Sequence, residues 1–354
     1  MRKVTYYLGL ALLLIGSSLT VYFAFQTSLI LRGDWGCAGI PQGYNELLLL
    51  ILINIGLALT GSLILRYPGF EATLTRKWPL SEFKRLIAAM VLTGGTVYAE
   101  PSTHKYAVRY YGKDLVLHEI FCSLLKRVYG IEVKPAQWRM NNSYMTQVYR
   151  RELVEDLLAL SPTYTCRGNG FSSGVPAPSA AFLLEAREPV IREAVRLAIS
   201  STGYLGYSVE ARFNGGERYV LRPVFTFGHL SPPSLLAEYQ QVLRRIGIET
   251  SMVFNGRFEK KGFLRSKSWR TLEALEKLGG FIPGVKIGSG NFRGVERNHM
   301  LDALLMAYRN GSYSFNSRWE AAEAIRSRIY SLRNLRSRFK PSADSSAFPP
   351  HQEG

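Results

Sequence analysis

The chain contains 354 residues, more than a typical single domain, and 44 Lys and Arg against 27 Asp and Glu give it a net charge of +17. A hydrophobic content of 47% excludes a disordered or collagen-like chain. Cys37, Cys122 and Cys166 have no CxxC spacing, which argues against a disulfide framework and a cysteine zinc site. The positive charge predicts a polyanionic partner, an anionic lipid surface, or simply a soluble basic surface.

Two long apolar runs lie in the first part of the chain. Val4 to Leu31 holds 28 residues without a formal charge, and Leu47 to Leu65 holds another 19. About 20 apolar residues cross the hydrocarbon core of a bilayer, and the first run is too long for the core of a signal peptide. We therefore expect residues 1–78 to form a transmembrane hairpin, with spans at about 5–30 and 47–65.

The basic residues beside these runs predict the orientation of the hairpin. Arg2 and Lys3 precede the first run and Arg32 lies between the two, whereas Arg66, Arg76, Lys77, Lys84 and Arg85 follow the second. The positive-inside rule then makes this a two-pass membrane protein with its N-terminus and C-terminal domain in the cytoplasm and Cys37 on the other side. Most of the charge lies elsewhere, because 38 Lys and Arg and 24 Asp and Glu follow residue 77, a net +14.

The rest of the chain repeats one order of elements: helix, strand pair, helix, strand pair, helix. In residues 79–160 the pattern predicts helices at 82–93, 115–129 and 152–160, with strands at 96–99, 105–111, 133–140 and 144–150. A Gly, Pro and Ser-rich linker follows at 161–187. In residues 188–310 it predicts helices at 189–201, 235–246 and 270–278, with strands at 204–213, 218–227, 250–255 and 263–267. We therefore expect an α+β protein of two pseudo-twofold units.

Residues 311–354 form a basic C-terminal segment. Ser317 and Glu320 have the spacing of a capping box, which predicts the start of a helix with apolar positions that include Ile325 and Ile329. The polar tail after this helix is predicted to be disordered.

The first helix of each copy ends in a similar way. Ala88 to Gly95 and Val195 to Gly203 both run from small apolar residues through small polar residues to a glycine, and a strand follows each. Small residues let two helix backbones approach closely, and glycine lets the chain leave the helix. When the two copies are aligned on these glycines, residues from about 80 to 310 resemble the single-chain LAGLIDADG homing endonucleases. Leu275 to Phe281 also resembles the closing helix of that family.

This resemblance implies a duplicated αββαββα fold that binds double-stranded DNA as a monomer with an internal pseudo-dimer. The family's chemistry uses an acidic residue before the motif glycine of each copy, and the two carboxylates hold the divalent metals that activate water. Gly94 and Thr202 occupy these positions here, and the nearest acids downstream are Glu100 and Glu210. We therefore expect no metal ligands, with Mg²⁺ needed only if cleavage survives by other ligands.

Strand periodicity adds a set of DNA-binding candidates. In the family the strands after each motif lie in the major groove, and side chains two residues apart share a face. The candidates are Thr96, Tyr98, Lys105, Arg109, Tyr111, Lys134 and Arg139 in the first copy, and Tyr204, Ser208, Arg212, Arg218, Arg222, Arg257, Lys261, Arg265 and Lys267 in the second. The resemblance further implies a lysine beside the scissile phosphate, for which the matching positions are Lys267 and Gln147.

These patterns favour a membrane-anchored protein that binds double-stranded DNA on a LAGLIDADG scaffold and lacks cleavage activity. An active, divergent LAGLIDADG endonuclease is one alternative, and a membrane protein whose duplicated domain binds a protein or lipid is another. The five histidines have no metal spacing, and no small-molecule cofactor motif is present. A translational fusion of an endonuclease-derived reading frame to an unrelated membrane segment also fits the sequence. Binding to random duplex with a steep salt dependence separates the DNA-binding hypotheses from the lipid or protein hypothesis.

Overall fold

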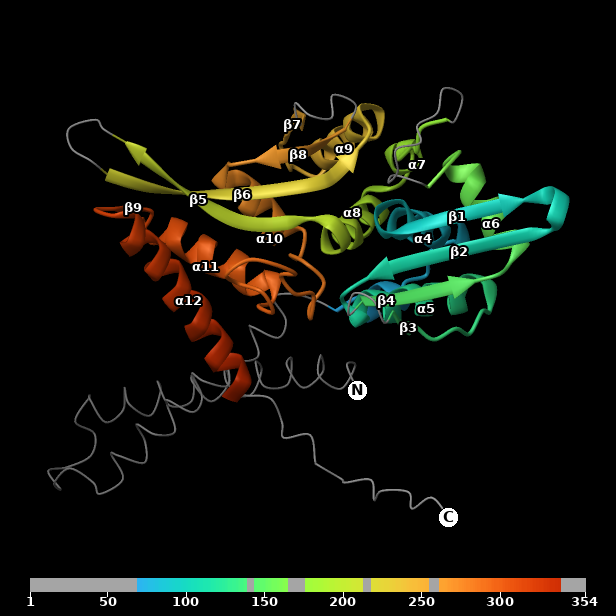
Figure 1. The fold of residues 1–354 in the computed structure, drawn as a ribbon, viewed down its shortest axis with the longest axis horizontal. Coiled ribbons are helices and arrows are strands. Elements are labelled where there is room, and N and C mark those ends of the chain that lie inside the picture. Colours follow the sequence, from blue (N-terminus) through green and yellow to red (C-terminus); the bar gives the residue numbers. More distant parts are fainter. Residues whose placement is uncertain (1–68, 139–142, 165–175, 213–217, 255–260, 339–354) are drawn as a thin grey trace, which may run out of the picture.

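The structure is a computed structural model that describes residues 69–138, 143–164, 176–212, 218–254 and 261–338 (Figure 1). Both predicted membrane spans, Arg139, Arg257 and the C-terminal tail lie outside these residues. Within the described ranges, no helix is both long and apolar enough to cross a bilayer.

The first unit, from α4 to α6, forms a four-stranded antiparallel sheet covered by helices on one face. Its strands are β1 (Gly95–Glu100), β2 (Lys105–Gly112), β3 (Ala136–Trp138) and β4 (Ser143–Val148), in the order β1-β2-β4-β3. Its helices are α4 (Leu80–Gly94), α5 (Leu115–Tyr129) and α6 (Arg151–Leu160). Helix α5 coincides with the predicted helix because Gly130, in a left-handed conformation with φ of 65°, ends it.

The second unit, from α8 to α10, repeats this arrangement. Helices α8 (Glu188–Thr202), α9 (Pro233–Arg245) and α10 (Trp269–Lys277) pack with β5 (Tyr204–Arg212), β6 (Arg218–Ser231), β7 (Ser251–Phe254) and β8 (Gly262–Ser266). The strand order β5-β6-β8-β7 is the same as in the first sheet. The predicted α+β class with two antiparallel sheets is therefore confirmed.

Several elements lie outside the repeat. The 3₁₀ turn η1 (Pro101–Thr103) joins β1 to β2, and short helices α3 (Glu71–Leu74) and α7 (Ala181–Leu184) precede the two units. Helix α11 (Arg297–Arg309) and strand β9 (Ser314–Phe315), which pairs with β6, were not predicted. Helix α12 (Arg318–Arg338) begins as the capping box predicts, because the backbone N–H of Glu320 donates to Ser317 Oγ at 3.1 Å.

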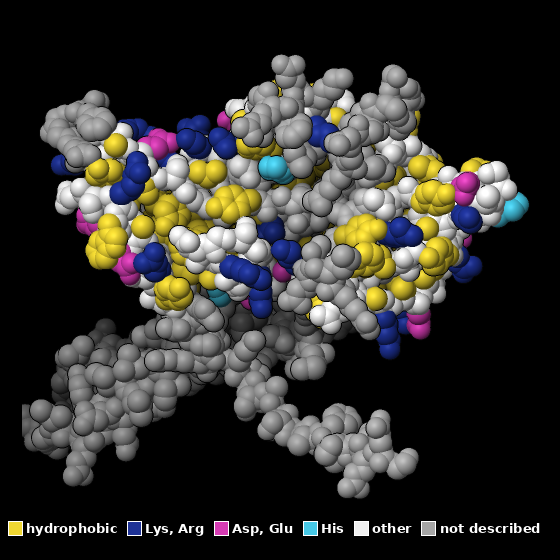
Figure 2. Space-filling view, viewed as in Figure 1, with side chains coloured by type: hydrophobic (Ala, Val, Ile, Leu, Met, Phe, Trp, Pro, Cys, Tyr) yellow, Lys and Arg dark blue, Asp and Glu magenta, His cyan; other side chains and the backbone are white. Residues whose placement is uncertain are grey.

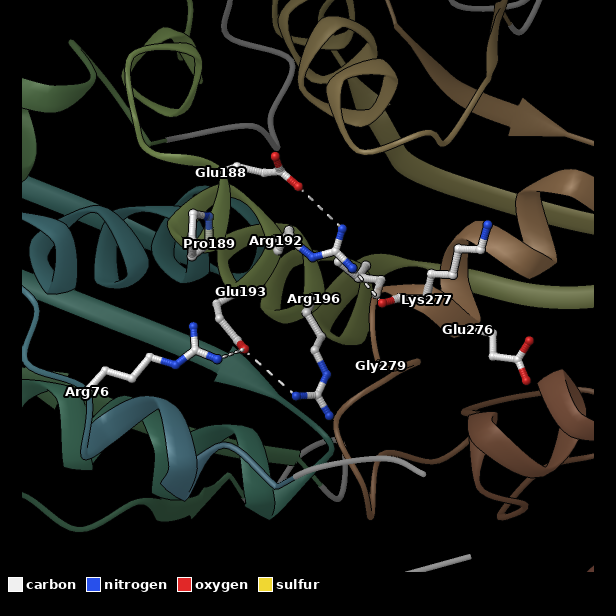
Figure 3. A pocket seen from close by; sticks show the side chains of 10 residues that line it. Arg76, Glu188, Pro189, Arg192, Glu193, Arg196, Glu276, Lys277 and Gly279 are labelled. Carbon is white, nitrogen blue, oxygen red and sulfur yellow. Dashed lines mark hydrogen bonds and ion pairs between the residues drawn. The ribbon is translucent and has the colours of Figure 1, made fainter. Parts of the chain in front are cut away.

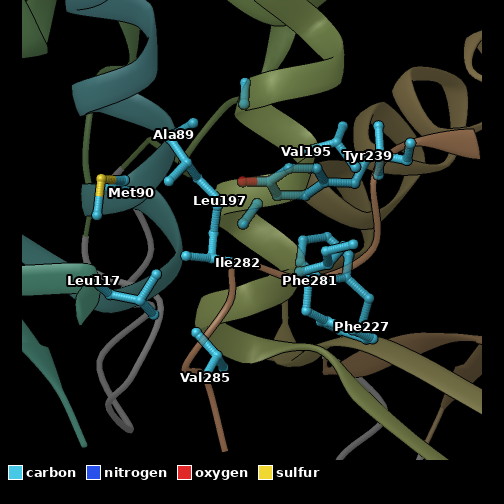
Figure 4. Packing of buried hydrophobic residues seen from close by; sticks show 14 of the residues in the cluster. Ala89, Met90, Leu117, Val195, Leu197, Phe227, Tyr239, Phe281, Ile282 and Val285 are labelled. Carbon is cyan, nitrogen blue, oxygen red and sulfur yellow. The ribbon is translucent and has the colours of Figure 1, made fainter. Parts of the chain in front are cut away.

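The two units meet where α4 packs against α8 (Figure 1). Small residues, among them Ala88, Ala89 and Ala198, are fully buried in these helices, and small side chains allow close approach of the two backbones. Buried residues of both units then form one continuous core, in which Ala89 of α4 lies near Leu197 of α8 (Figure 4). The pairing of α4 with α8 therefore fixes how the two sheets are placed.

His118 is a fully buried ionisable group under the first sheet. Its Nδ1 lies 2.8 Å from Thr146 Oγ1, and its ring centroid lies 4.9 Å from that of Tyr110. Burial lowers the pKa of His118 to about 4, because the charged imidazolium loses its hydration. The neutral form therefore belongs to the folded state.

We expect acid to weaken the fold through His118. The folded pKa is about 4, whereas the unfolded pKa is about 6.5, so this contribution is complete above about pH 7 and is lost as the pH falls toward the folded pKa. Between about pH 7 and pH 5 the parent should lose about 2 kcal/mol of its free energy of unfolding through His118. The variant His118→Gln should not show this part of the loss. Urea unfolding at the two pH values measures this difference. The exposed His229 provides the control, since His229→Gln should follow the parent; equal losses in all three proteins would refute the assignment.

Candidate functional site

The first-unit outer face is the side of the β1-β2-β4-β3 sheet that the helices leave uncovered. Thr96, Arg109 and Gln147 lie directly opposite one another on β1, β2 and β4. The alternate set points into the core, where Val108 and Tyr110 are fully buried. The register therefore places the predicted residues Thr96, Tyr98, Lys105, Arg109 and Tyr111 together on this outer face, and Lys134 lies exposed just before β3.

The second-unit outer face is the corresponding side of the β5-β6-β8-β7 sheet. Ser208 lies opposite Arg222, Arg212 opposite Arg218, and Thr226 opposite Arg265. Leu205 and Leu221, on the alternate positions, are buried. The outer face thus carries Tyr204, Ser208, Glu210, Arg212, Arg218, Arg222, Arg265 and Lys267, and Lys261 lies just before β8.

Cations dominate the second-unit outer face. Its one carboxylate, among the described residues, is that of Glu210, which accepts a hydrogen bond from Lys267 Nζ at 2.7 Å and lies 3.9 Å from Arg222 Nε. The hydrogen bond from Lys267 holds the pKa of Glu210 below its usual value, so the carboxylate is ionised at neutral pH. Four cationic charges remain on this face after Glu210 is counted. Lys and Arg side chains lie among hydrophobic ones across the side of the molecule shown in Figure 2.

Arg212 and Arg218 form an exposed part of this charge. The two residues are direct cross-strand partners at the end of the β5-β6 hairpin, and both are exposed. Neither forms an ion pair with a carboxylate of the described residues. Like charges in directly opposite positions destabilise a sheet, and a bound anion relieves that repulsion.

The carboxylate of Glu100 on the first-unit outer face is already engaged. It accepts hydrogen bonds from the hydroxyls of Tyr98 at 2.7 Å and Thr103 at 2.5 Å. These bonds, chiefly the one from Thr103, lower the pKa of Glu100. The Tyr98 hydroxyl is thereby tied back to its own strand, and its ring is 51% exposed.

The register of the two sheets gives each residue of the first-unit outer face a corresponding position in the second unit. Gly95 and Gly203 follow the two central helices, so Thr96 corresponds to Tyr204. Across each sheet Thr96 aligns with Gln147, and Tyr204 aligns with Arg265. In this register Arg265, two residues before Lys267, lies in the position that corresponds to Gln147.

The C-terminal ends of α4 and α8 contain neutral side chains engaged in local contacts. Ser201 Oγ accepts a hydrogen bond from the buried Tyr110 hydroxyl at 3.5 Å, and Ser200 Oγ accepts one from the backbone N–H of Ile282 at 2.9 Å. A Cβ added at Gly94 would lie 2.8 Å from the Tyr110 ring and 2.9 Å from Ser201 Oγ. There is thus no room at Gly94 for a side chain without local movement.

A guanidinium group lies at the end of α8. Arg297, the first residue of α11, donates from Nη1 to the carbonyl oxygens of Ile199 at 3.0 Å and Gly203 at 2.5 Å. A cation is favourable at a helix C-terminus, where carbonyl groups lack helical partners. Burial lowers the pKa of Arg297, but the group stays protonated, with Asp114 contributing favourably to its charge.

The residues at these helix ends do not fit a divalent metal. Gly94 offers no ligand, and the Thr202 hydroxyl faces the Ala198 carbonyl oxygen at 3.4 Å. Asp114, whose pKa is raised by burial, accepts a hydrogen bond from the Lys286 backbone at 2.9 Å. Hard cations require several oxygen ligands with negative charge, whereas a guanidinium already occupies this region. No group of three His, Cys, Asp or Glu suited to a metal occurs among the residues that the structure describes.

A pocket of about 640 Å³ lies near the other end of α8 (Figure 3). Glu193 lies 3.7 Å from Arg76 and 3.8 Å from Arg196, and Glu188 lies 3.7 Å from Arg192. Its charged residues therefore largely neutralise one another. The pocket is separate from both outer faces, and its ion pairs join the start of the described chain to α8.

Sequence reasoning missed three residues that the structure makes prominent. Trp138 and Tyr149 are 40% and 72% exposed beside the predicted residues of the first-unit outer face. Counting by two from Lys134 and Gln147 would have found both. No local signal could have found Arg297, because its partners lie 94 to 98 residues away in the chain.

A scan against family models and a search of curated proteins found no match. Similar solved structures include I-SmaMI bound to an uncleaved DNA target, with 10% identity and a TM-score of 0.43 over 71% of this chain and 98% of that one. The LAGLIDADG homing endonuclease I-LtrWI bound to target DNA has 9% identity and a TM-score of 0.42 over 72% of this chain and 98% of that one. I-DmoI in complex with DNA and Mn has 8% identity and a TM-score of 0.37 over 58% of this chain and 98% of that one.

Gly94→Ala should destabilise the protein. The new methyl group would crowd the Tyr110 ring and the Tyr111 carbonyl oxygen, the latter at 3.2 Å. Overpacking costs about 1–3 kcal/mol and outweighs the gain of up to about 1 kcal/mol in helix propensity. Urea unfolding measures the net loss. Gly288→Ala is the matched control, because nothing lies within 4 Å of its added Cβ; equal stability of the two variants would show that the helix ends are not tightly packed.

Proposed function

We propose that this chain binds double-stranded DNA chiefly through its second-unit outer face, does not cleave it at the helix ends, and is held at a membrane by its N-terminal segment. The observation that carries the DNA-binding part is the charge of the second-unit outer face. Five cations, two of them directly opposed arginines, share that face with one carboxylate. A phosphate backbone supplies the regularly spaced negative charges that such a face lacks.

The arginines of the second-unit outer face are placed to contact the phosphates of DNA. Arg212 and Arg218 are exposed at the end of the β5-β6 hairpin and Arg222 lies on the same face, so these residues are placed to neutralise phosphates. Arg265 is held against the Phe263 ring, with its guanidinium carbon 5.0 Å from the ring centroid. This contact orients one cation without neutralising its charge, because the ring carries no net charge.

The expected absence of cleavage rests on the side chains that the helix ends could offer to a metal ion. Neutral side chains and the Arg297 guanidinium stand where two carboxylates would be needed, so these residues cannot assemble a divalent cation site. Purified protein should leave supercoiled plasmid intact in Mg²⁺ or Mn²⁺. Nicking that persists in highly purified protein and disappears with a variant on either outer face would support the endonuclease alternative instead.

Arg218→Ala should weaken binding to duplexes of any sequence. Loss of one phosphate contact reduces the slope of log K against log salt by about 1. The full-length chain in detergent, titrated against labelled duplex at several salt concentrations, provides the measurement. Arg244→Ala is the matched control, because Arg244 is exposed on α9, behind the same sheet. Salt-independent binding, or an equal effect of both substitutions, would contradict the proposed interface.

The membrane part of the proposal rests on the two uncharged runs of 28 and 19 residues and on the excess of Lys and Arg after them. It predicts that Cys37 is accessible to reagents on the side of the membrane opposite to the C-terminal domain. A variant that retains only Cys37 should react with a membrane-impermeant maleimide on intact cells, and a variant that retains only Cys166 should react only after permeabilisation. Release of the protein by alkaline carbonate would overturn the anchor without affecting DNA binding.

A further inference from the structure

The two outer faces differ in chemistry although their strands share one topology. The second-unit outer face is mainly cationic, whereas the first-unit outer face is rich in exposed aromatic rings. Tyr98 is 51%, Tyr111 36%, Trp138 40% and Tyr149 72% exposed. Water-exposed rings of this size on a sheet that already has a complete core need a reason other than packing.

These four rings lie on the first-unit outer face in two groups, which together we call the aromatic platform. Tyr98 lies opposite Ala107 and Tyr149 follows Val148, the partner of Val108, whereas Tyr111 lies four residues beyond Ala107 on β2, beside Trp138. Tyr98 lies on β1, Tyr111 on β2 and Trp138 on β3, and Tyr149 follows β4. Since β1 and β3 are the two edges of a four-stranded sheet, the platform extends about 14 Å across it. Tyr111 and Trp138 make an edge-to-face contact with centroids 6.3 Å apart.

The neighbours of the platform leave the ring faces accessible. Tyr98 lies opposite Ala107 and Trp138 opposite Ser143, so small side chains occupy the cross-strand positions. Two of the three tyrosine hydroxyls are tied to the sheet, because Tyr98 donates to Glu100 at 2.7 Å and Tyr149 accepts from the Gln147 amide. The Tyr98 and Tyr149 rings are therefore both exposed and restrained, which lowers the entropy lost when a planar ligand stacks on them.

A regular duplex does not use such a platform, because its bases already stack on each other and only their edges face the grooves. Unpaired bases expose both of their faces, and each stacked base contributes about 1–3 kcal/mol. Lys105 and Arg109 lie on the same face and can contact the phosphates between stacked bases.

We propose that the first-unit outer face binds unpaired nucleotides by stacking, while the second-unit outer face binds a duplex. The preferred ligand is then a nucleic acid whose duplex part continues into a single-stranded segment. This inference rests on the proposed function, because the duplex must occupy the second-unit outer face for the single strand to reach the platform.

Three labelled probes with equal numbers of phosphates test the inference on the full-length chain in detergent: a blunt duplex, a single strand, and a duplex with a single-stranded overhang. The overhang probe should bind at least about tenfold more tightly than the blunt duplex, as one or more stacked bases predict. DNA and RNA overhangs on the same DNA duplex distinguish the two sources of unpaired bases, and preferential binding of either one supports the platform.

Variants of the platform assign the effect to stacking. Trp138→Ala should lose about tenfold in affinity for the overhang probe and keep its affinity for the blunt duplex. Tyr98→Phe, which retains the ring, is the conservative control for Tyr98→Ala. Tryptophan fluorescence provides a second readout, since quenching by the overhang probe should be lost in Trp138→Phe. Because these side chains are exposed, circular dichroism should show an unchanged fold.

The outcomes separate this inference from the function on which it rests. If the blunt duplex and the overhang probe bind equally and Trp138→Ala changes neither, the platform does not bind bases and only this inference fails. If no probe binds even at low salt, the proposed function fails as well. Equal losses for both probes in the aromatic variants would show a general role in duplex contact and would also overturn the inference.

Discussion

The packing of α4 against α8 is the contact on which the rest of the architecture depends. Each helix is followed directly by the first strand of its sheet, so the approach of the two helices sets the distance and angle between the two outer faces. Small buried residues such as Ala88 and Ala198 allow that approach, and the lack of a side chain at Gly94 leaves room for Tyr110 and Ser201. Arg297 then adds hydrogen bonds to the carbonyl oxygens of Ile199 and Gly203 at the end of α8.

The helix ends and the outer faces consequently have different physical roles. At the helix ends, short neutral side chains and one guanidinium satisfy buried backbone groups, and their contacts hold the two units together. On the outer faces, charges and rings are left toward solvent at the cost of repulsion between Arg212 and Arg218 and of exposed apolar area. Groups held in this costly state are available to a ligand, whereas those at the helix ends are already in use.

Local patterns account for most of the fold. Period-two alternation identified the exposed face of both sheets, and Gly130 identified the end of α5, because these features depend on neighbouring residues only. Long-range contacts decided the rest. The counterpart of Gln147 depends on the pairing of β6 with β8, β9 forms only because β6 extends to meet it, and Arg297 acts on α8 through tertiary packing. No local pattern encodes such contacts. The predicted membrane spans lie outside the described residues and stay predictions.

The unequal lengths of the two central hairpins matter beyond stability. Strand β6 spans Arg218–Ser231, whereas its counterpart β2 spans only Lys105–Gly112. A true twofold protein would accept a linear polymer equally well in either direction. In this chain the duplicated halves present a long cationic arm on one side and a short aromatic surface on the other. Any polymer that lies across both therefore acquires a polarity, because reversing it would exchange charge for stacking. The duplicated halves of this chain therefore distinguish the two directions of a bound polymer.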